Sequence, residues 1–197
     1  MTPEHRYDYI LAIDPSGNFN EGHGTTGWSL IDYNTNLIEC DYISAINYDC
    51  PEEFWNAHTE LITKFAQKYH KKLMVVIEDY KLYQNRSQSQ INSKMETCRL
   101  IGLLQWHCWK LGQPYTLQMA TQVKNRWSDK VLFNDSIIYR EGNKIIHNPS
   151  KKPITLCHIR DSFRHAMHYA TFKNLFKNEP VNRTYNTYRP KSRYSRY

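Results

Sequence analysis

The chain has 197 residues, enough for one domain with a full hydrophobic core and too few for two comfortable domains. Its net charge of +7 and its 15 tyrosines favour a polyanionic partner, because aromatic side chains stack on bases while basic ones neutralise phosphates. Five cysteines without a CxxC pair argue against a disulfide framework or a zinc site. With no leader and no apolar run of membrane-spanning length, we expect a cytoplasmic protein that does not contact a membrane.

The first part of the chain predicts four strands and one helix. Residues 8–14 form an apolar run that is typical of a buried central strand. Alternating residues over 27–43, divided by an Asn-rich turn, predict two further strands in a meander. Residues 51–69 begin with proline and repeat apolar side chains at helical spacing, which predicts a helix. The run 73–78 then predicts a fourth strand.

The second part predicts three helices, a short strand and a hairpin. An apolar stripe over 95–111 indicates a helix that glycine and proline end. Residues 115–119 predict a short strand and 120–133 a single basic helix. Residues 136–147 alternate around a glycine and predict an exposed hairpin. A last helix, with Thr155 at or before its start, is expected to run to about residue 175.

This order of elements predicts one α/β domain over residues 1–176. A meander followed by strands that helices connect implies a mixed five-stranded sheet with helices on both faces and the hairpin inserted before the last helix. Residues 177–197 are rich in Arg, Lys and Tyr, with almost nothing apolar to bury. We therefore expect a disordered basic tail there.

Four metal-capable residues stand at distinctive places in these elements. Asp14 and Glu78 each end an aliphatic strand, where a carboxylate is costly unless it is paired, solvated or bound to metal. His158 and Asp161 lie three residues apart on one side of the last helix. An alternative for Asp14 is that it only stabilises the turn after its strand. His165 also lies on this stripe, and we interpret it, like His168, as part of an ordinary polar face.

If the last helix packs against the ends of the two strands, these residues converge. A bare group of carboxylates repels itself and needs cations to be stable. Carboxylate oxygens suit Mg²⁺, and one imidazole shifts the preference modestly toward Mn²⁺. Two such ions about 4 Å apart can activate a water and stabilise the leaving oxygen in phosphodiester hydrolysis. The pattern predicts a nuclease that holds two ions.

The sequence resembles the RuvC-type Holliday-junction resolvases of the RNase H-like superfamily, in particular a phage-type branch. The resemblance spans about residues 8–172 and rests on five short segments, namely 10–15, 26–30, 75–78, 122–124 and 158–166. It implies an RNase H-like fold in which Asp14, Glu78, His158 and Asp161 are the catalytic metal ligands. The family often has aspartate where this chain has His158. The loop after Asp14 is longer than usual, and the hairpin and tail are additional.

The resemblance also implies branched DNA as the substrate and a homodimer as the active form, because two symmetric nicks need two sites. Lys124 matches a family position near the DNA backbone, and the segment after Glu78 matches one whose aromatic residue stacks in the opened junction. With the basic residues of nearby elements, the expected DNA contacts are Tyr80, Lys81, Tyr83, Arg86, Lys124, Arg126, Lys151 and Lys152.

Three other interpretations stay open. An RNase H-like ribonuclease or a general flap nuclease would use the same acidic site on another substrate. A non-catalytic nucleic-acid-binding protein would need no acidic site, and the acidic residues kept on three separate elements argue against it. A sugar-kinase-like ATPase shares the first elements but needs glycine-rich phosphate loops, and the chain has only 7 glycines.

Overall fold

The structure, a computed structural model, describes residues 6–19, 22–80 and 95–174. The predicted tail and three of the predicted DNA contacts, Lys81, Tyr83 and Arg86, lie outside the described residues. Within the described ranges, no helix combines the length and apolar character that crossing a membrane requires.

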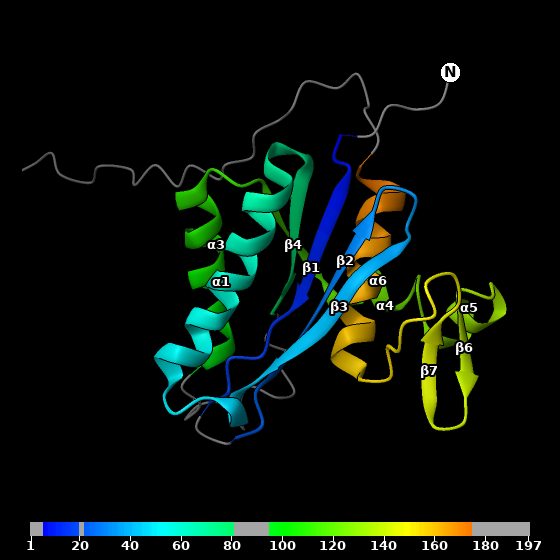
Figure 1. Cartoon of the computed structure of the whole chain (residues 1–197), viewed down its shortest axis with the longest axis horizontal. Coiled ribbons are helices and arrows are strands. Elements are labelled where there is room, and N and C mark those ends of the chain that lie inside the picture. Colours follow the sequence, from blue (N-terminus) through cyan, green and yellow to red (C-terminus); the bar gives the residue numbers. More distant parts are fainter. Residues whose placement is uncertain (1–5, 20–21, 81–94, 175–197) are drawn as a thin grey trace, which may run out of the picture.

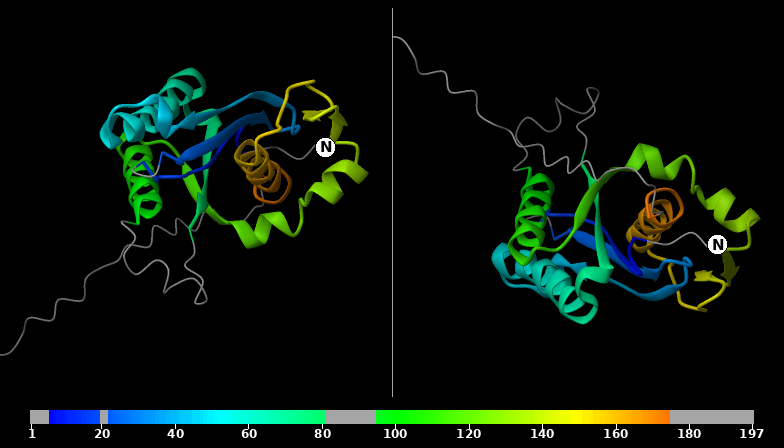
Figure 2. Two further views of the ribbon diagram at one scale, coloured as in Figure 1. Left: turned by 90° about the horizontal axis from the view of Figure 1, so that it is seen from below. Right: turned by 90° about the horizontal axis from the view of Figure 1, so that it is seen from above.

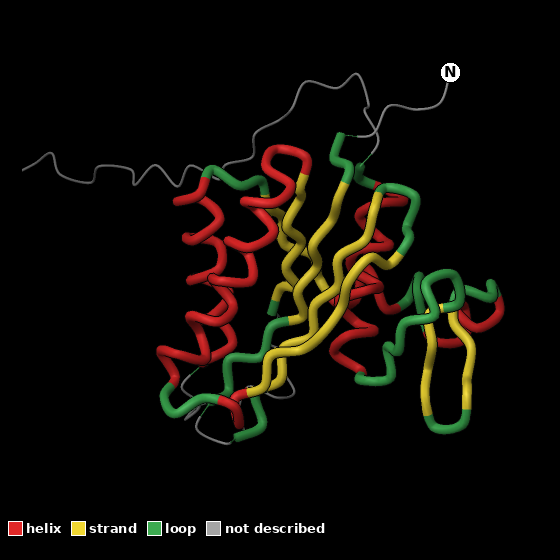
Figure 3. The backbone as a smooth tube through the Cα atoms, in the orientation of Figure 1, coloured by secondary structure: helices red, strands yellow, loops and turns green. Residues whose placement is uncertain are grey.

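A five-stranded mixed sheet forms the centre of the protein, as predicted (Figures 1 and 3). Its strand order is β3-β2-β1-β4-β5, in which β1 and β2 pair antiparallel while β1, β4 and β5 run parallel. The strands are β1 (Tyr9–Asp14), β2 (Thr25–Asp32), β3 (Leu37–Ser44), β4 (Leu73–Asp79) and β5 (Tyr115–Met119).

Helices cover both faces of this sheet (Figure 2). The helices α1 (Pro51–Tyr69) and α3 (Glu96–Leu111) lie on one face, and α6 (Cys157–Phe172) lies on the other. Alternate side chains of the central strands enter two separate cores, with Leu11 on the side of α1 and Ile10 on the side of α6. Two short 3-10 helices, η1 (Ala45–Asn47) and η2 (His70–Lys72), flank α1.

The segment between β5 and α6 forms a small unit beside α6, which we call the insertion (residues 125–153). It holds α5 (Asp129–Asn134) and the predicted hairpin of β6 (Ile138–Glu141) and β7 (Lys144–His147), and it follows α4 (Ala120–Lys124). Figure 1 shows the hairpin extending away from the main sheet.

One predicted element in this region is wrong, and one predicted helix start is now defined. The predicted helix over 120–133 is two short helices, because Ser128 adopts an extended conformation and its side chain accepts a hydrogen bond from the Val131 N–H. The last helix runs from Cys157 to Phe172 with Leu156 as its N-cap, so Thr155 precedes the helix, which is one of the two predicted arrangements. The Thr155 hydroxyl instead accepts a hydrogen bond from the Ile145 N–H in β7, at 3.0 Å.

The backbone of α6 approaches β2 very closely at Gly27. A Cβ atom at this position would lie 2.1 Å from the carbonyl carbon of His158. Nearby, the buried Ser29 hydroxyl contacts the Ser162 hydroxyl at 2.8 Å and donates to the Ile159 carbonyl at 3.2 Å. Glycine at position 27 therefore lets the first turn of α6 reach the sheet.

We expect Gly27→Ala to lower the free energy of unfolding by about 3 kcal/mol, since backbone atoms on α6 cannot move aside without shifting the helix. Gly102→Ala is the matched control, because a Cβ at Gly102 meets no atom within 4 Å. That control should gain about 0.5–1 kcal/mol from helix propensity. Urea denaturation of both variants measures the difference, and equal stabilities would contradict the close contact.

Candidate active site

The parallel pairing of β1 with β4 brings the first two predicted ligands to one edge of the sheet. Ile13 pairs with Ile77, so Asp14 and Glu78 follow at the same level of neighbouring strands. The first turn of α6 then brings His158 alongside, with its Nδ1 donating to Asp14 Oδ2 at 2.8 Å. Three elements that are distant in the sequence therefore meet at this edge.

Lys124, at the end of α4, joins the fourth predicted ligand to this group. Its Nζ lies 2.9 Å from Asp161 Oδ2 and 3.8 Å from Glu78 Oε1. The resemblance predicted only that Lys124 lies near DNA. In this structure its ammonium is a cation between two of the predicted metal-ligating carboxylates.

His165 is a site residue that the sequence analysis missed. It is fully buried, and its Nε2 donates to Glu78 Oε2 at 3.0 Å while its Nδ1 lies 2.9 Å from Gln118 Oε1. The interpretation of this histidine as part of an ordinary polar face is therefore wrong. Its spacing of four residues from Asp161 was the available signal, because such residues share one side of a helix. His168, in contrast, lies against the ring of Phe172.

The carboxylates differ in how well nearby positive charges and hydrogen bonds offset their negative charge. Burial raises the pKa of Asp14 to about 6, with the charges of Glu78 and Asp161 adding to the rise and the hydrogen bond from His158 opposing it. Burial also acts to raise the pKa of Glu78, but the hydrogen bond and charge of His165 and the charge of Lys124 outweigh it and lower that pKa. The hydrogen bond to Asp14 raises the pKa of His158.

The donor set suits a hard divalent cation, although the side chains are not arranged around one. Among residues 6–19, 22–80 and 95–174, no three His, Cys, Asp or Glu side chains stand close enough to hold an ion as they are. Three carboxylates and one imidazole nevertheless match the preferences of Mg²⁺ and Mn²⁺. The position of the Lys124 ammonium shows that this site holds positive charge between two carboxylates.

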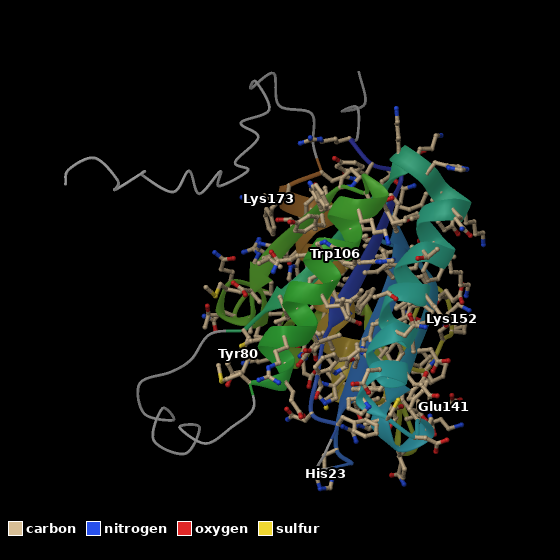
Figure 4. The ribbon with its side chains drawn as sticks, turned by 90° about the vertical axis from the view of Figure 1, so that its left-hand side faces the viewer. His23, Tyr80, Trp106, Glu141, Lys152 and Lys173 are labelled. Carbon is tan, nitrogen blue, oxygen red and sulfur yellow. The ribbon has the colours of Figure 1, made fainter. Side chains whose placement is uncertain are left out.

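The remaining predicted DNA contacts are spread over the surface. Tyr80 directly follows β4 and is partly buried against the core beneath α1 and α3. Arg126 is exposed between α4 and α5, and its guanidinium lies 5.4 Å from the Phe172 ring centroid. Lys151 and Lys152 follow β7, and Figure 4 shows Lys152 well apart from Tyr80. These four residues do not form one patch.

Two solved structures share this arrangement of strands and helices. The chain is similar to T. thermophilus RuvC in complex with a Holliday junction substrate, with a TM-score of 0.60 and 14% identity over 83% of this chain and 93% of that one. The chain is also similar to a structure of Thermus thermophilus RuvC, with a TM-score of 0.58 and 12% identity over 85% of this chain and 98% of that one. No protein-family model and no curated protein matches the chain. At these identities the likeness establishes the RuvC-like fold, and with it the predicted fold class.

A buried hydrogen-bond chain supports the turn after Asp14. His58 Nδ1 donates to the Phe54 carbonyl at 2.7 Å, so its Nε2 accepts from the Thr26 hydroxyl at 2.8 Å. The same hydroxyl oxygen accepts the Ser16 N–H at 2.9 Å. Because burial lowers the pKa of His58 to about 4, this histidine stays neutral and keeps the one tautomer that the chain requires.

We expect His58 to destabilise the fold in acid. Unfolded, it takes up a proton near its ordinary pKa of about 6.5, whereas the folded protein resists until about pH 4. As the pH falls between these values the unfolded state gains the proton first, so His58 alone should lower the free energy of unfolding by about 1.4 kcal/mol per pH unit. Denaturant unfolding from pH 7 to 4.5 measures this slope, which His58→Gln should reduce.

His147 provides the matched variant for that measurement. Burial also lowers its pKa to about 4, but it lies on β7 and contacts Ser150 rather than the turn after Asp14. His147→Gln should therefore reduce the slope to a similar extent. A His58→Gln curve parallel to that of the wild type would show that His58 is not buried in its neutral form.

Proposed function

We propose that this protein is a metal-dependent endonuclease that cleaves branched DNA and resolves Holliday junctions. The observation that carries the proposal is the meeting of Asp14, Glu78 and Asp161, from β1, β4 and α6, at one edge of the sheet, with the ammonium of Lys124 between Glu78 and Asp161. The RuvC-like fold supports it, since a similar structure is RuvC with a Holliday junction substrate.

In this proposal, Asp14, Glu78, Asp161 and His158 hold two Mg²⁺ or Mn²⁺ ions. Ions held by these residues would supply an activated water and would stabilise the leaving oxygen of the phosphodiester. The Lys124 ammonium, which pairs with Asp161 Oδ2 in this structure, would pair with a backbone phosphate when Asp161 serves as a ligand. His165 keeps Glu78 oriented through its hydrogen bond.

Two further surfaces belong to the proposal. The arms of the junction are bound by the predicted DNA contacts on several elements, namely Tyr80, Lys81, Tyr83, Arg86, Arg126, Lys151 and Lys152. The second surface is the outer face of α3, where Trp106 and Trp109 expose 52% and 63% of their area (Figure 4). Because paired nicks need two sites related by a two-fold axis, we assign this aromatic face to contact with a second copy of the chain.

Asp14→Asn, Glu78→Gln and Asp161→Asn should each reduce cleavage of a labelled four-way junction in Mg²⁺ by more than about a hundredfold, the upper range for residues that only support a metal ligand. Junction binding in Ca²⁺, measured by gel shift, should stay close to that of the wild type. His158→Asp should remain active because it supplies an oxygen ligand, whereas His158→Ala should lose most activity.

Asp41→Asn is the control for these variants, since Asp41 is exposed on β3 and the substitution also removes one negative charge. It should cut at the wild-type rate. A ligand variant that cuts as fast as Asp41→Asn would remove that residue from the proposed site.

The substrate itself is tested by competition between nucleic acids. A junction resolvase holds two arms at once, so a four-way junction should bind far more tightly than a linear duplex of equal length. On an immobile junction we expect paired nicks near the branch point, on strands of like polarity. An RNase H-like ribonuclease would instead recognise the 2′-hydroxyl of an RNA–DNA hybrid. Cleavage of the hybrid, or of a flap, with the junction left whole would contradict junction resolution.

A further inference from the structure

The insertion is connected by charge to one of the proposed metal ligands. Arg164 of α6 donates through Nη1 to Asp161 Oδ1, one helical turn earlier, and through Nη2 to Asp129 Oδ1 in the first turn of α5. One guanidinium therefore joins the proposed ligand Asp161 to an aspartate of the insertion.

Two of the three groups, Arg164 and Asp161, are largely buried, whereas the side chain of Asp129 is 46% exposed. The side chain of Arg164 is 10% exposed and that of Asp161 14%, so both charges depend on protein partners rather than water. The ion pairs of Arg164 within the described part of the chain are with Asp161 and Asp129. Asp129 is held in turn by Arg160, whose Nε lies 3.3 Å from its Oδ1. Two arginines of α6 therefore form ion pairs with the insertion through Asp129.

The two oxygens of Asp161 have separate partners. Arg164 holds Oδ1, while Oδ2 faces Lys124 and, beyond it, Glu78. A hydrogen bond to one carboxylate oxygen restricts rotation of the side chain. The other oxygen of Asp161 therefore stays directed at the place where a cation would lie. Such outer partners of metal ligands fix their orientation and tune their affinity.

We propose that Asp129 and Arg164 are positioning residues for Asp161, so that the insertion is part of the metal site although none of its own residues is a proposed ligand. This rests on the proposed function, in which Asp161 is a ligand. The insertion and the site are then coupled, and a change at the partly exposed Asp129 alters cation binding at Asp161.

The first experiment is calorimetric titration of the full-length chain with Mn²⁺. Asp129→Asn should weaken Mn²⁺ binding by about tenfold, the lower range for an outer-shell partner. Asp135→Asn, an exposed position at the end of the same helix, should leave it unchanged. In an Arg164→Gln background, Asp129→Asn should have no further effect. Wild-type affinity in Asp129→Asn, or full additivity with Arg164→Gln, would overturn the proposal.

The second experiment needs no metal. In EDTA, the free energies of unfolding of Asp129→Asn, Asp161→Asn and the double variant form a thermodynamic cycle. The double variant should lose more stability than the two single losses together, because only then has the buried guanidinium lost both of its carboxylates. Strict additivity would overturn the proposal. If the wild type bound no Mn²⁺, the proposed metal site would fail, and this cycle would still decide the positioning role.

Discussion

Parallel pairing between β1 and β4 is the constraint on which the site depends. Two buried aliphatic strands in register, each ending in a carboxylate, bring Asp14 and Glu78 together at one edge of the sheet. Like charges brought together in a partly buried place repel one another, and side chains from neighbouring helices offset this repulsion. The strands are stable because their apolar residues fill two cores, and this stability holds the carboxylates in an unfavourable position.

The compensation comes from four side chains on two helices. Lys124 ends α4, and His158, Arg164 and His165 lie along α6. The interactions of Glu78 with His165 and Lys124 lower its pKa despite burial. At Asp14, the single hydrogen bond from His158 does not prevent burial from raising the pKa. Of these two carboxylates, Asp14 therefore has the more to gain from an added cation. This agrees with its place at the end of the central strand of the sheet.

The features that could be predicted from the sequence are those that a local residue pattern determines. Aliphatic runs ending in Asp14 and Glu78 identified the strands, and the spacing of His158 and Asp161 identified the side of the last helix that reaches them. His165 could not be told apart in this way, because a polar stripe looks the same whether it meets water or a buried carboxylate. Likewise, the break at Ser128 depends on one capping hydrogen bond, a weak signal within a basic segment that otherwise fits a helix.

A local pattern does not show which charged side chains from distant segments come to lie next to one another. Lys124 occupies its position only because α4 ends beside α6, and from there it opposes the two carboxylates that a divalent cation would need. Under the proposed function, Lys124 and a cation compete for Asp161 Oδ2, and a phosphate near the site offers the displaced ammonium a new partner. The same lysine therefore lowers the cost of bringing Glu78 and Asp161 together, and it does so from a segment that no strand or helix pattern connects to them.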